Sequence, residues 1–475
     1  MSVDVGAKPA PVKLTLKDYK SDLHNDWCPG CVAPSTRIVM ADGSSRRIAD
    51  VDAGDRVIAH DGESHTVLQA TSHRHNDTMR RIAVRGHGEL IITRDHPMFI
   101  MRREAVLEHG VTAAADWLPA GEVEPGDYVA YPHPALVTAG ASTDRASYSL
   151  RSIASNDEVE YDAMVHNLEV EGAHSYLTVG ATLHNCGDFG ILTGIQMALA
   201  QLNLDPDKVA CFSGIGCSGK TPHYIKSYGF HTLHGRVLPS ATGGRLANSD
   251  VTVLAMGGDG DGYGIGAGYF VNSGRRNLNF TYIVHNNNVY GLTKGQASPT
   301  LSKGKKMKSM PEQAIQDGIN PIAMAVASGY TFIARAYALE PKYLAGIIVK
   351  AIQHPGSSLV DVLQTCPTYN DLYTKEWYEG ADLPDKKSRL YKLEEQGYDG
   401  VVKDPADMQE IIAKKAAAVA RSYETEPIPT GIYYQCALPT YEDGVNGRIP
   451  ALAEKPLVEI DTFHRDVTPL LDAMR

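Results

Sequence analysis

Residues 31–185 separate two short motifs that would otherwise form one continuous string. The first motif reads W-C-P-G at 27–30 and runs into Cys31, and the second reads C-G-D-F-G at 186–190. Deletion of the intervening block would join them as W-C-P-G-C-G-D-F-G. The sequence therefore predicts two parts with separate cores: an insert, and a host whose cysteine motif the insert interrupts.

The composition of the chain changes at the same two points. Lysine is absent from residues 31–185, although the chain has 22 lysines, and this block holds 13 arginines and 11 of the 18 histidines. Such a block indicates a separate evolutionary history. We therefore divide the chain into an N-terminal host segment at 1–30, an insert at 31–185, and a host domain with a C-terminal extension at 186–475.

The overall composition narrows the class of protein. Hydrophobic residues make up 43% and charged residues 21% of the chain, which is ordinary for a soluble globular protein. The net charge of −11 argues against a nucleic-acid partner. No apolar run approaches the roughly 18 residues that a membrane helix needs, and no signal-peptide core is present. Seven cysteines spread over a long chain suit a reducing compartment, so we expect a cytoplasmic protein without a membrane partner.

The insert has the pattern of a β protein. Short apolar runs such as R-I-V-M at 37–40 and R-V-I-A at 56–59 are each followed by an Asp-Gly pair, at 42–43 and 61–62. An Asp-Gly pair between apolar runs is a strong hairpin signal. The insert is therefore predicted to be nearly all-β.

The residues at the two ends of the insert have the chemistry for its excision. Cys31 can attack the carbonyl carbon of Gly30 and convert an amide into a thioester. Cys186 can then take over the acyl group, since a thiol is an intrinsically good nucleophile. Asn185 can cyclise onto its own carbonyl and release the insert, with His184 placed to transfer a proton.

A third element, T-R-D-H at 93–96, supplies the Thr93 hydroxyl and the His96 imidazole, which could polarise the first scissile amide. Together these features resemble an intein of the Hint type over the whole of residues 31–185. The resemblance implies an all-β Hint fold and a role for His174, a histidine that the family often places near the end. Asn167 stands where many members have Asp, which puts the proton relay there in doubt. No homing-endonuclease segment is recognised, as in a mini-intein.

The host sequence predicts a strand, glycine loop, helix and strand in succession. An apolar run at 251–256 ends in G-G-D-G-D-G, and a second run at 280–284 ends in H-N-N-N. This order is typical of a parallel α/β sheet with flanking helices, where Asp259 and Asn287 would lie at the carboxyl ends of nearby strands. Their oxygens suit Mg²⁺ holding a diphosphate, and Gly258 and Gly260 would let the backbone approach the phosphates.

Two other ligand loops fail at this position. A strict G-x-G-x-x-G is absent, and an EF-hand loop starting at Asp259 would place Tyr263 and Phe270 at ligand positions. The spacing resembles the thiamine diphosphate motif, in which G-D-G is followed after some 25–30 residues by Asn. The 28-residue step from Asp259 to Asn287 fits this motif, and Val289 would supply a carbonyl ligand.

Four cysteines could form a metal site in the host. Removal of the insert gives Cys28 and Cys186 a C-x-x-C spacing, Cys217 lies in G-I-G-C-S-G-K, and Cys366 precedes a proline. Four thiolates could hold a [4Fe–4S] cluster, but they could equally hold structural zinc. Residue types alone leave both metals open.

The host strings together resemble the β subunit of 2-oxoacid:ferredoxin oxidoreductases over nearly all of 19–30 and 186–440. The matching pieces include the joined cysteine motif, G-I-G-C-S-G-K, G-G-D-G-D-G, N-V-Y-G-L-T-K-G-Q and Q-T-C-P-T-Y-N. The resemblance implies an α/β thiamine diphosphate-binding fold with a cluster on Cys28, Cys186, Cys217 and Cys366. It also implies thiamine diphosphate and Mg²⁺ on Asp259, Asn287 and Val289.

The same resemblance implies the partners. Coenzyme A, a 2-oxoacid and ferredoxin would react with this chain, and an α subunit would carry the glutamate that activates the cofactor. Lys220 and Lys294 are candidates to pair with a substrate carboxylate or a coenzyme A phosphate, and Lys220 favours 2-oxoglutarate or a broad substrate range. Two alternatives stay open: a non-redox decarboxylase or carboligase with structural zinc, and an insert that is retained as a binding module.

Overall fold

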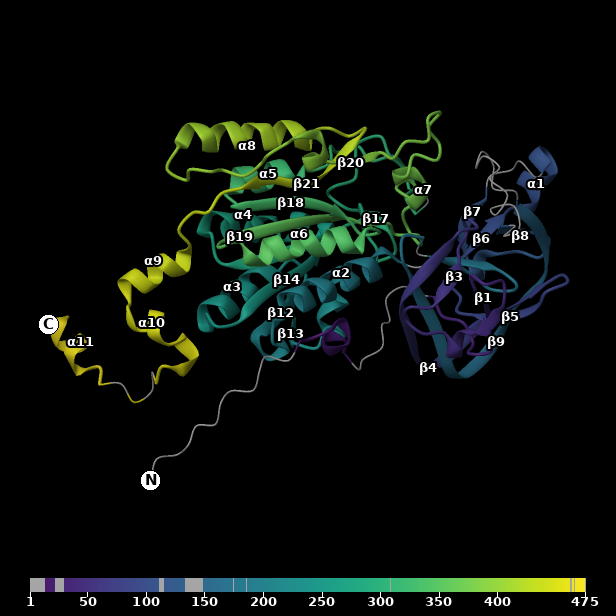
Figure 1. The fold of residues 1–475 in the computed structure, drawn as a ribbon, viewed down its shortest axis with the longest axis horizontal. Helices are drawn as coiled ribbons and strands as arrows, with labels where there is room; N and C mark the ends of the chain where they lie inside the picture. Colours follow the sequence, from purple (N-terminus) through teal and green to yellow (C-terminus); the bar gives the residue numbers. More distant parts are fainter. Residues whose placement is uncertain are drawn as a thin grey trace, which may run out of the picture.

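The computed structural model describes residues 13–21, 30–110, 115–132, 148–173, 175–184, 186–307, 309–461, 464 and 466–474. In Figure 1 a strand-rich insert lies beside a larger host built of helices around a sheet. Three of the predicted site residues, Cys28, His174 and Asn185, lie outside the described residues. Over the part that is described, no helix combines the length and the apolar character needed to cross a membrane.

The insert is β-structured, which confirms the prediction from its hairpin signals. Two long antiparallel strands, β4 (Ser64–Val84) and β9 (Tyr148–Val170), pair along almost their whole length. They belong to a sheet of order β10-β11-β6-β8-β9-β4-β3, with β5 on β4 and β7 on β6. The shorter elements are β1 (Arg37–Val39), β2 (Ser45–Arg47), β3 (Arg56–Ile58), β5 (Gly88–Ile92), β6 (Pro97–Met101), α1 (Arg103–His109), β7 (Asp116–Pro119), β8 (Tyr128–Pro132), β10 (Ser175–Leu177) and β11 (Thr182–His184).

The host contains one eight-stranded sheet of order β13-β12-β14-β15-β19-β18-β21-β20. Its first six strands run parallel, and β21 is antiparallel to β18. The strands are β12 (Val209–Ser213), β13 (Tyr228–His231), β14 (Thr252–Gly258), β15 (Phe280–Asn286), β18 (Phe332–Tyr337), β19 (Ser357–Leu363), β20 (Leu390–Lys392) and β21 (Ile428–Gln435). The predicted strand–loop–helix–strand unit is therefore present, with β14 and β15 as neighbours.

Helices cover both faces of this sheet, because its central strands are apolar on both sides. One core cluster joins strand residues to α2 (Gly187–Leu202) and α6 (Pro341–Gln353). The other cluster joins the alternate strand residues to α3 (Val237–Ala247), α4 (Ala267–Arg276), α5 (Pro321–Ser328) and α8 (Met408–Ser422). The remaining elements are β16 (Val289–Tyr290), β17 (Gln296–Ala297), α7 (Lys375–Tyr378), α9 (Tyr441–Arg448), α10 (Ala451–Glu454) and α11 (Thr468–Ala473).

The N-terminal host segment is already packed on the host while the insert is present. Tyr19 is fully buried in the core cluster that contains α2. Its hydroxyl lies 3.0 Å from the carbonyl oxygen of Leu199 and 2.6 Å from that of Leu204. Lys20 forms a β-bridge with Ile225. The two pieces of the host are thus packed together with the insert in place.

Candidate functional site

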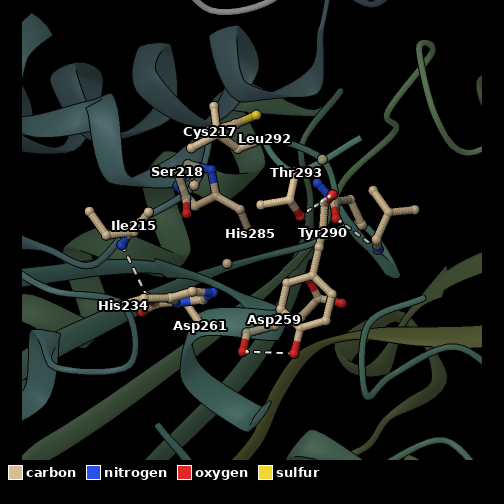
Figure 2. Close-up of a pocket in the computed structure, with 16 residues that line it drawn as sticks. Ile215, Cys217, Ser218, His234, Asp259, Asp261, His285, Tyr290, Leu292 and Thr293 are labelled. Carbon is tan, nitrogen blue, oxygen red and sulfur yellow. Dashed lines mark hydrogen bonds and ion pairs between the residues drawn. The ribbon is translucent and has the colours of Figure 1, made fainter. Parts of the chain in front are cut away.

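A pocket lies at the carboxyl end of β12, β14 and β15 (Figure 2). Asp259 directly follows β14 and Asn287 directly follows β15, and these strands are parallel neighbours in which Gly258 pairs with His285. The pocket is lined by residues of the loops that follow these three strands, among them Cys217, Asp259 and Asn287. The structure therefore places Asp259 and Asn287 together, as the sheet-edge argument predicted.

Asp259 is held in one orientation and keeps one oxygen open. Its Oδ2 accepts hydrogen bonds from the Asn288 backbone N–H at 3.0 Å and from the hydroxyls of Ser298 and Thr300. Its Oδ1 is buried and has no hydrogen-bond partner among the described residues. Burial raises the pKa of this carboxyl group to about 6, although the two hydroxyls act in the opposite direction. An open, oriented carboxylate oxygen in a pocket is a natural ligand for a hard cation.

Asn287 and Val289 lie on the facing loop. The Val289 N–H donates to Asn287 Oδ1 at 3.1 Å, and Asn287 Nδ2 donates to Gln364 Oε1 at 2.8 Å. A third bond, from Asn370 Nδ2 to the Asn287 carbonyl at 2.8 Å, fixes the backbone. These bonds determine the direction of the amide oxygen, and the oxygen types fit Mg²⁺.

The glycines of the loops that follow β12 and β14 are required mainly by packing. A Cβ at Gly260 would lie 2.2 Å from the ring of Tyr290, and one at Gly214 would lie 2.2 Å from Asp261 Oδ2. A Cβ at Gly258 would be 3.4 Å from Ser218 Oγ, which is an ordinary contact. That Gly258 and Gly260 let the backbone approach a ligand stays a prediction, and at Gly260 the ring of Tyr290 also leaves no room for a side chain.

Two further polar pairs near this pocket are not evident from the sequence. The carboxylate oxygen Asp261 Oδ1 lies 2.7 Å from His234 Nδ1 and accepts from the backbone N–H of Gly235 at 2.8 Å. The second pair joins His285 Nδ1 to Asp188 Oδ1 at 2.5 Å. Only the spacing of His234 in H-T-L-H-G-R, at 231–236, offered a signal in the sequence.

Four buried polar atoms of the pocket lack hydrogen-bond partners within the described ranges. They are Ser218 Oγ, Asp259 Oδ1, Asp261 Oδ2 and His285 Nε2. Buried polar atoms are normally paired, so a cluster of open ones marks a ligand site. A hydroxyl, an imidazole and two carboxylates could bind a polar, metal-bound ligand.

The predicted cluster cysteines lie on neighbouring loops. Cys186 is the N-cap of α2, and its Sγ lies 3.5 Å from Asp188 Oδ2. The same Sγ lies 3.4 Å from Gln364 Nε2, and Gln364 precedes Cys366 by two residues. Cys217 lines the pocket, whereas Cys366 packs in a small apolar cluster. Among the described residues, which exclude Cys28, no three His, Cys, Asp or Glu side chains are gathered as metal ligands. The described part of the chain, with the insert present, therefore shows no complete cluster site.

The two candidate lysines do not line this pocket. Lys220 lies in the short 3-10 helix Ser218–Tyr224, and Lys294 lies exposed in the turn between β16 and β17 with a positive φ of 87°. The structure alone gives neither lysine a ligand-binding role.

The N-terminal junction of the insert brings three predicted residues together. The Cys31 N–H donates to Thr93 Oγ1 at 2.9 Å, and the Thr93 N–H donates to the Cys31 carbonyl at 3.0 Å. The His96 ring packs against Gly30, where an added Cβ would lie 3.2 Å from the ring. The peptide bond between Gly30 and Cys31 is thus enclosed by a hydroxyl and an imidazole. Cys31 Sγ also lies 3.9 Å from His73 Nδ1, a neighbour that the sequence did not suggest.

The C-terminal junction is described only in part. His184 is the last residue of β11 and pairs with Ser175 of β10, and Cys186 of the host is buried. Asn167 is a buried residue of β9, and its Oδ1 accepts from the hydroxyl of Tyr176 at 2.8 Å. The amide at the position where Hint proteins often carry Asp is therefore engaged in a hydrogen bond.

Two buried histidines, His60 and His96, are expected to make the insert less stable in acid. Burial lowers the pKa of His96 to about 3 and that of His60 to about 4. The unfolded chain takes up these protons near pH 6.5, so stability is complete above that pH and falls as the pH drops toward 4. We expect the free energy of unfolding of the insert to fall by about 2 kcal/mol per histidine between neutral pH and pH 5. Hydrogen exchange of insert peptides at pH 7.5 and 5, in a Cys31→Ala chain, measures this loss. His60→Gln should reduce the loss of stability at pH 5, whereas substitution of the exposed His109 by Gln should leave it unchanged. An equal loss in the two variants would contradict a role for His60 in the acid sensitivity.

Comparisons with known proteins agree with the host geometry. Residues 209–362 match the family model described as thiamine pyrophosphate enzyme, C-terminal TPP binding domain. Residues 366–448 match the model for the C-terminal part of the pyruvate ferredoxin oxidoreductase beta subunit. A solved 2-oxoglutarate:ferredoxin oxidoreductase from Magnetococcus marinus is 33% identical, with a TM-score of 0.52, and the match covers 61% of this chain and 90% of that one.

Further comparisons each cover a part of the chain. A bacterial intein-like domain from Clostridium thermocellum is 19% identical with a TM-score of 0.25, over 33% of this chain and 98% of that one. The 2-oxoacid:ferredoxin oxidoreductase β subunit of Saccharolobus solfataricus is 52% identical over 57% of this chain and 87% of its own length. That of Aeropyrum pernix is 53% identical over 56% of this chain and 81% of its own length. At this identity and coverage, the chain belongs to the family of 2-oxoacid:ferredoxin oxidoreductase β subunits.

Proposed function

We propose that this chain is a precursor that excises residues 31–185 and then serves as the β subunit of a cytoplasmic enzyme. The enzyme oxidatively decarboxylates a 2-oxoacid to an acyl-CoA and CO₂, and passes the electrons to ferredoxin. The observation that carries the enzymatic part is the open Asp259 Oδ1 in a pocket shared with Asn287 and Val289. The family membership of the host supports the same reaction.

The pocket residues fit thiamine diphosphate and Mg²⁺. Asp259, Asn287 and the Val289 carbonyl would hold the cation, while the Ser298 and Thr300 hydroxyls keep Asp259 Oδ1 directed into the pocket. When bound, thiamine diphosphate supplies the electron sink for decarboxylation. The α subunit would complete the site, and coenzyme A and the 2-oxoacid would enter it, with Lys220 and Lys294 as candidate partners for their anionic groups.

Excision would complete the metal site of the host. The joined chain would give Cys28 and Cys186 a C-x-x-C spacing. Together with Cys217 and Cys366 they would supply the four thiolates that hold a [4Fe–4S] cluster. Structural zinc in a non-redox decarboxylase or carboligase is the second candidate, because thiolates also bind zinc. An assay of iron and acid-labile sulfide near four per spliced monomer supports the cluster, whereas zinc without iron would contradict it.

The N-terminal junction supports self-splicing. Cys31 Sγ would attack the Gly30 carbonyl carbon, forming a thioester and breaking the C–N bond, and the thiol proton would pass to the new amine. The Cys186 thiol would then displace Cys31. Asn185 would cyclise and break its bond to Cys186, with His184 and His174 assisting, and an S-to-N shift would join Gly30 to Cys186. Thr93 and His96 already contact the two residues of the first scissile bond.

Mass spectrometry of the expressed protein tests this proposal. Splicing converts the 51.4 kDa chain into a host of 320 residues and an insert of 155 residues. A full-length species as the sole product would favour a retained binding module. Turnover of pyruvate, 2-oxoglutarate and other 2-oxoacids by the spliced protein with its α subunit would identify the substrate, for which we expect 2-oxoglutarate or a broad range.

A further inference from the structure

We propose that the host surface around α7 is a docking site for the insert, which holds it in place for excision and screens Cys366 until excision occurs. This inference rests on the proposed self-splicing for its kinetic part. Figure 1 shows α7 on the side of the host that faces the insert. The docking site consists of α7 and the loop of residues 365–370.

Glu376 of α7 is the centre of the contact. Its Oε1 accepts from Trp117 Nε1 at 3.4 Å and lies 3.6 Å from His60 Nε2. Trp117 belongs to β7, and its ring contacts His60 with centroids 5.7 Å apart. Burial lowers the pKa of His60 to about 4, so the ring is neutral at neutral pH and the contact is polar without being an ion pair. One host carboxylate therefore engages two adjoining rings of the insert.

Two further contacts join the insert to other elements of the host. Lys342 Nζ of α6 lies 2.5 Å from Glu171 Oε1, in the turn that follows β9. Lys20 Nζ of the N-terminal segment donates to the Ala70 carbonyl of β4 at 3.4 Å. Three host segments thus contact three separated parts of the insert. Contacts at separated points fix an orientation, which a pair of covalent junctions alone would leave free.

A small cavity lies at the seam between the two parts. Asp116 and Trp117 of the insert form one wall, and the opposite wall contains Cys366, Pro367 and Asn370 of the host. Cys366 is 7% exposed in this arrangement. Removal of the insert takes away one wall of the cavity, so Cys366 becomes more accessible only after excision.

Docking also affects the chemistry of excision. Cys186 is fixed as the N-cap of α2 in the host, whereas the peptide bond that it must reach lies against Thr93 and His96 of the insert. An insert held against the host keeps these groups in a narrow range of positions, which raises the effective concentration of the nucleophile. Loss of the Glu376 contact should therefore slow the acyl transfer without changing either reacting residue.

The first test is the rate of splicing in a double-mutant cycle. Glu376→Ala and Trp117→Phe should each slow splicing by about fivefold, the range for loss of one partly buried polar contact. The double variant should be no slower than the slower single variant, because both changes remove the same contact. Glu379→Ala is the matched control, since its ion pair at 3.3 Å is with Lys375 inside the host. Unchanged rates in the single variants, or multiplicative effects in the double, would overturn the proposal.

The second test does not depend on splicing. In a chain with Cys31→Ala and Asn185→Ala, alkylation of Cys366 by iodoacetamide is followed by peptide mass spectrometry, with buried Cys436 as the internal reference. Glu376→Ala should speed Cys366 labelling by about fivefold over Glu379→Ala, and equal labelling would refute docking. If the wild-type chain fails to splice, the proposed splicing is wrong, while this labelling experiment still decides whether the insert is docked.

Discussion

Cys31→Ala is expected to abolish cleavage after Gly30, so that no ligated 320-residue product forms from the 51.4 kDa chain. The side chain at this position supplies the nucleophile for the first acyl shift, and alanine has no group that can form the thioester. The structure shows the surrounding groups in place, with Thr93 Oγ1 at 2.9 Å from the Cys31 N–H and the His96 ring against Gly30. Intact-mass spectrometry of the expressed protein measures the outcome directly.

Two comparisons make this result specific. Cys436→Ala removes a buried host cysteine that lies in a different core cluster from Cys186, and this variant should splice like the wild type. His96→Ala should keep the nucleophile but slow N-terminal cleavage by about 10²–10³-fold, the usual contribution of a positioned imidazole. A ligated 320-residue product from Cys31→Ala would show that another residue starts the reaction.

Local patterns predicted the features that depend on neighbouring residues. The Asp-Gly turns indicated a β insert, and the apolar runs before Asp259 and Asn287 placed both residues at one sheet edge, because parallel neighbouring strands end on the same side. The T-R-D-H element was predicted to polarise the amide before Cys31, and the structure places the Thr93 hydroxyl within hydrogen-bonding distance of the Cys31 N–H. In each case a short motif is positioned by one regular element.

The features that the sequence did not predict depend on partners that only the tertiary fold brings together. Asp188 is the second residue of α2 and His285 lies near the end of β15, 97 residues later, so neither residue alone suggests their pairing. The contact between Glu376 and Trp117 spans 259 residues and joins the host to the insert. The space beside Gly260 is likewise filled by Tyr290 from a separate loop.

Asp259→Asn in the spliced host, combined with its α subunit, should reduce turnover by at least about 10³-fold, or about 4 kcal/mol. Asn can keep one oxygen near its place, but it lacks the negative charge that Mg²⁺ requires to hold a diphosphate. Its amide group would also place a donor against a position where Asp259 Oδ2 accepts three hydrogen bonds. Isothermal titration of thiamine diphosphate in the presence of Mg²⁺ should therefore show no binding at concentrations that saturate the unsubstituted protein.

The control separates loss of the ligand from loss of the fold. Asp250→Asn changes an exposed carboxylate at the opposite end of β14 and should bind thiamine diphosphate normally. Ser298→Ala removes one of the groups that orient Asp259 while keeping its charge, so it should weaken binding by about tenfold, the usual cost of one hydrogen bond to a charged group. If Asp259→Asn bound the cofactor as tightly as Asp250→Asn did, the open Oδ1 would not be a metal ligand. If affinity for thiamine diphosphate instead falls in the order Asp250→Asn, Ser298→Ala, Asp259→Asn, the reaction depends on the open Oδ1 of Asp259.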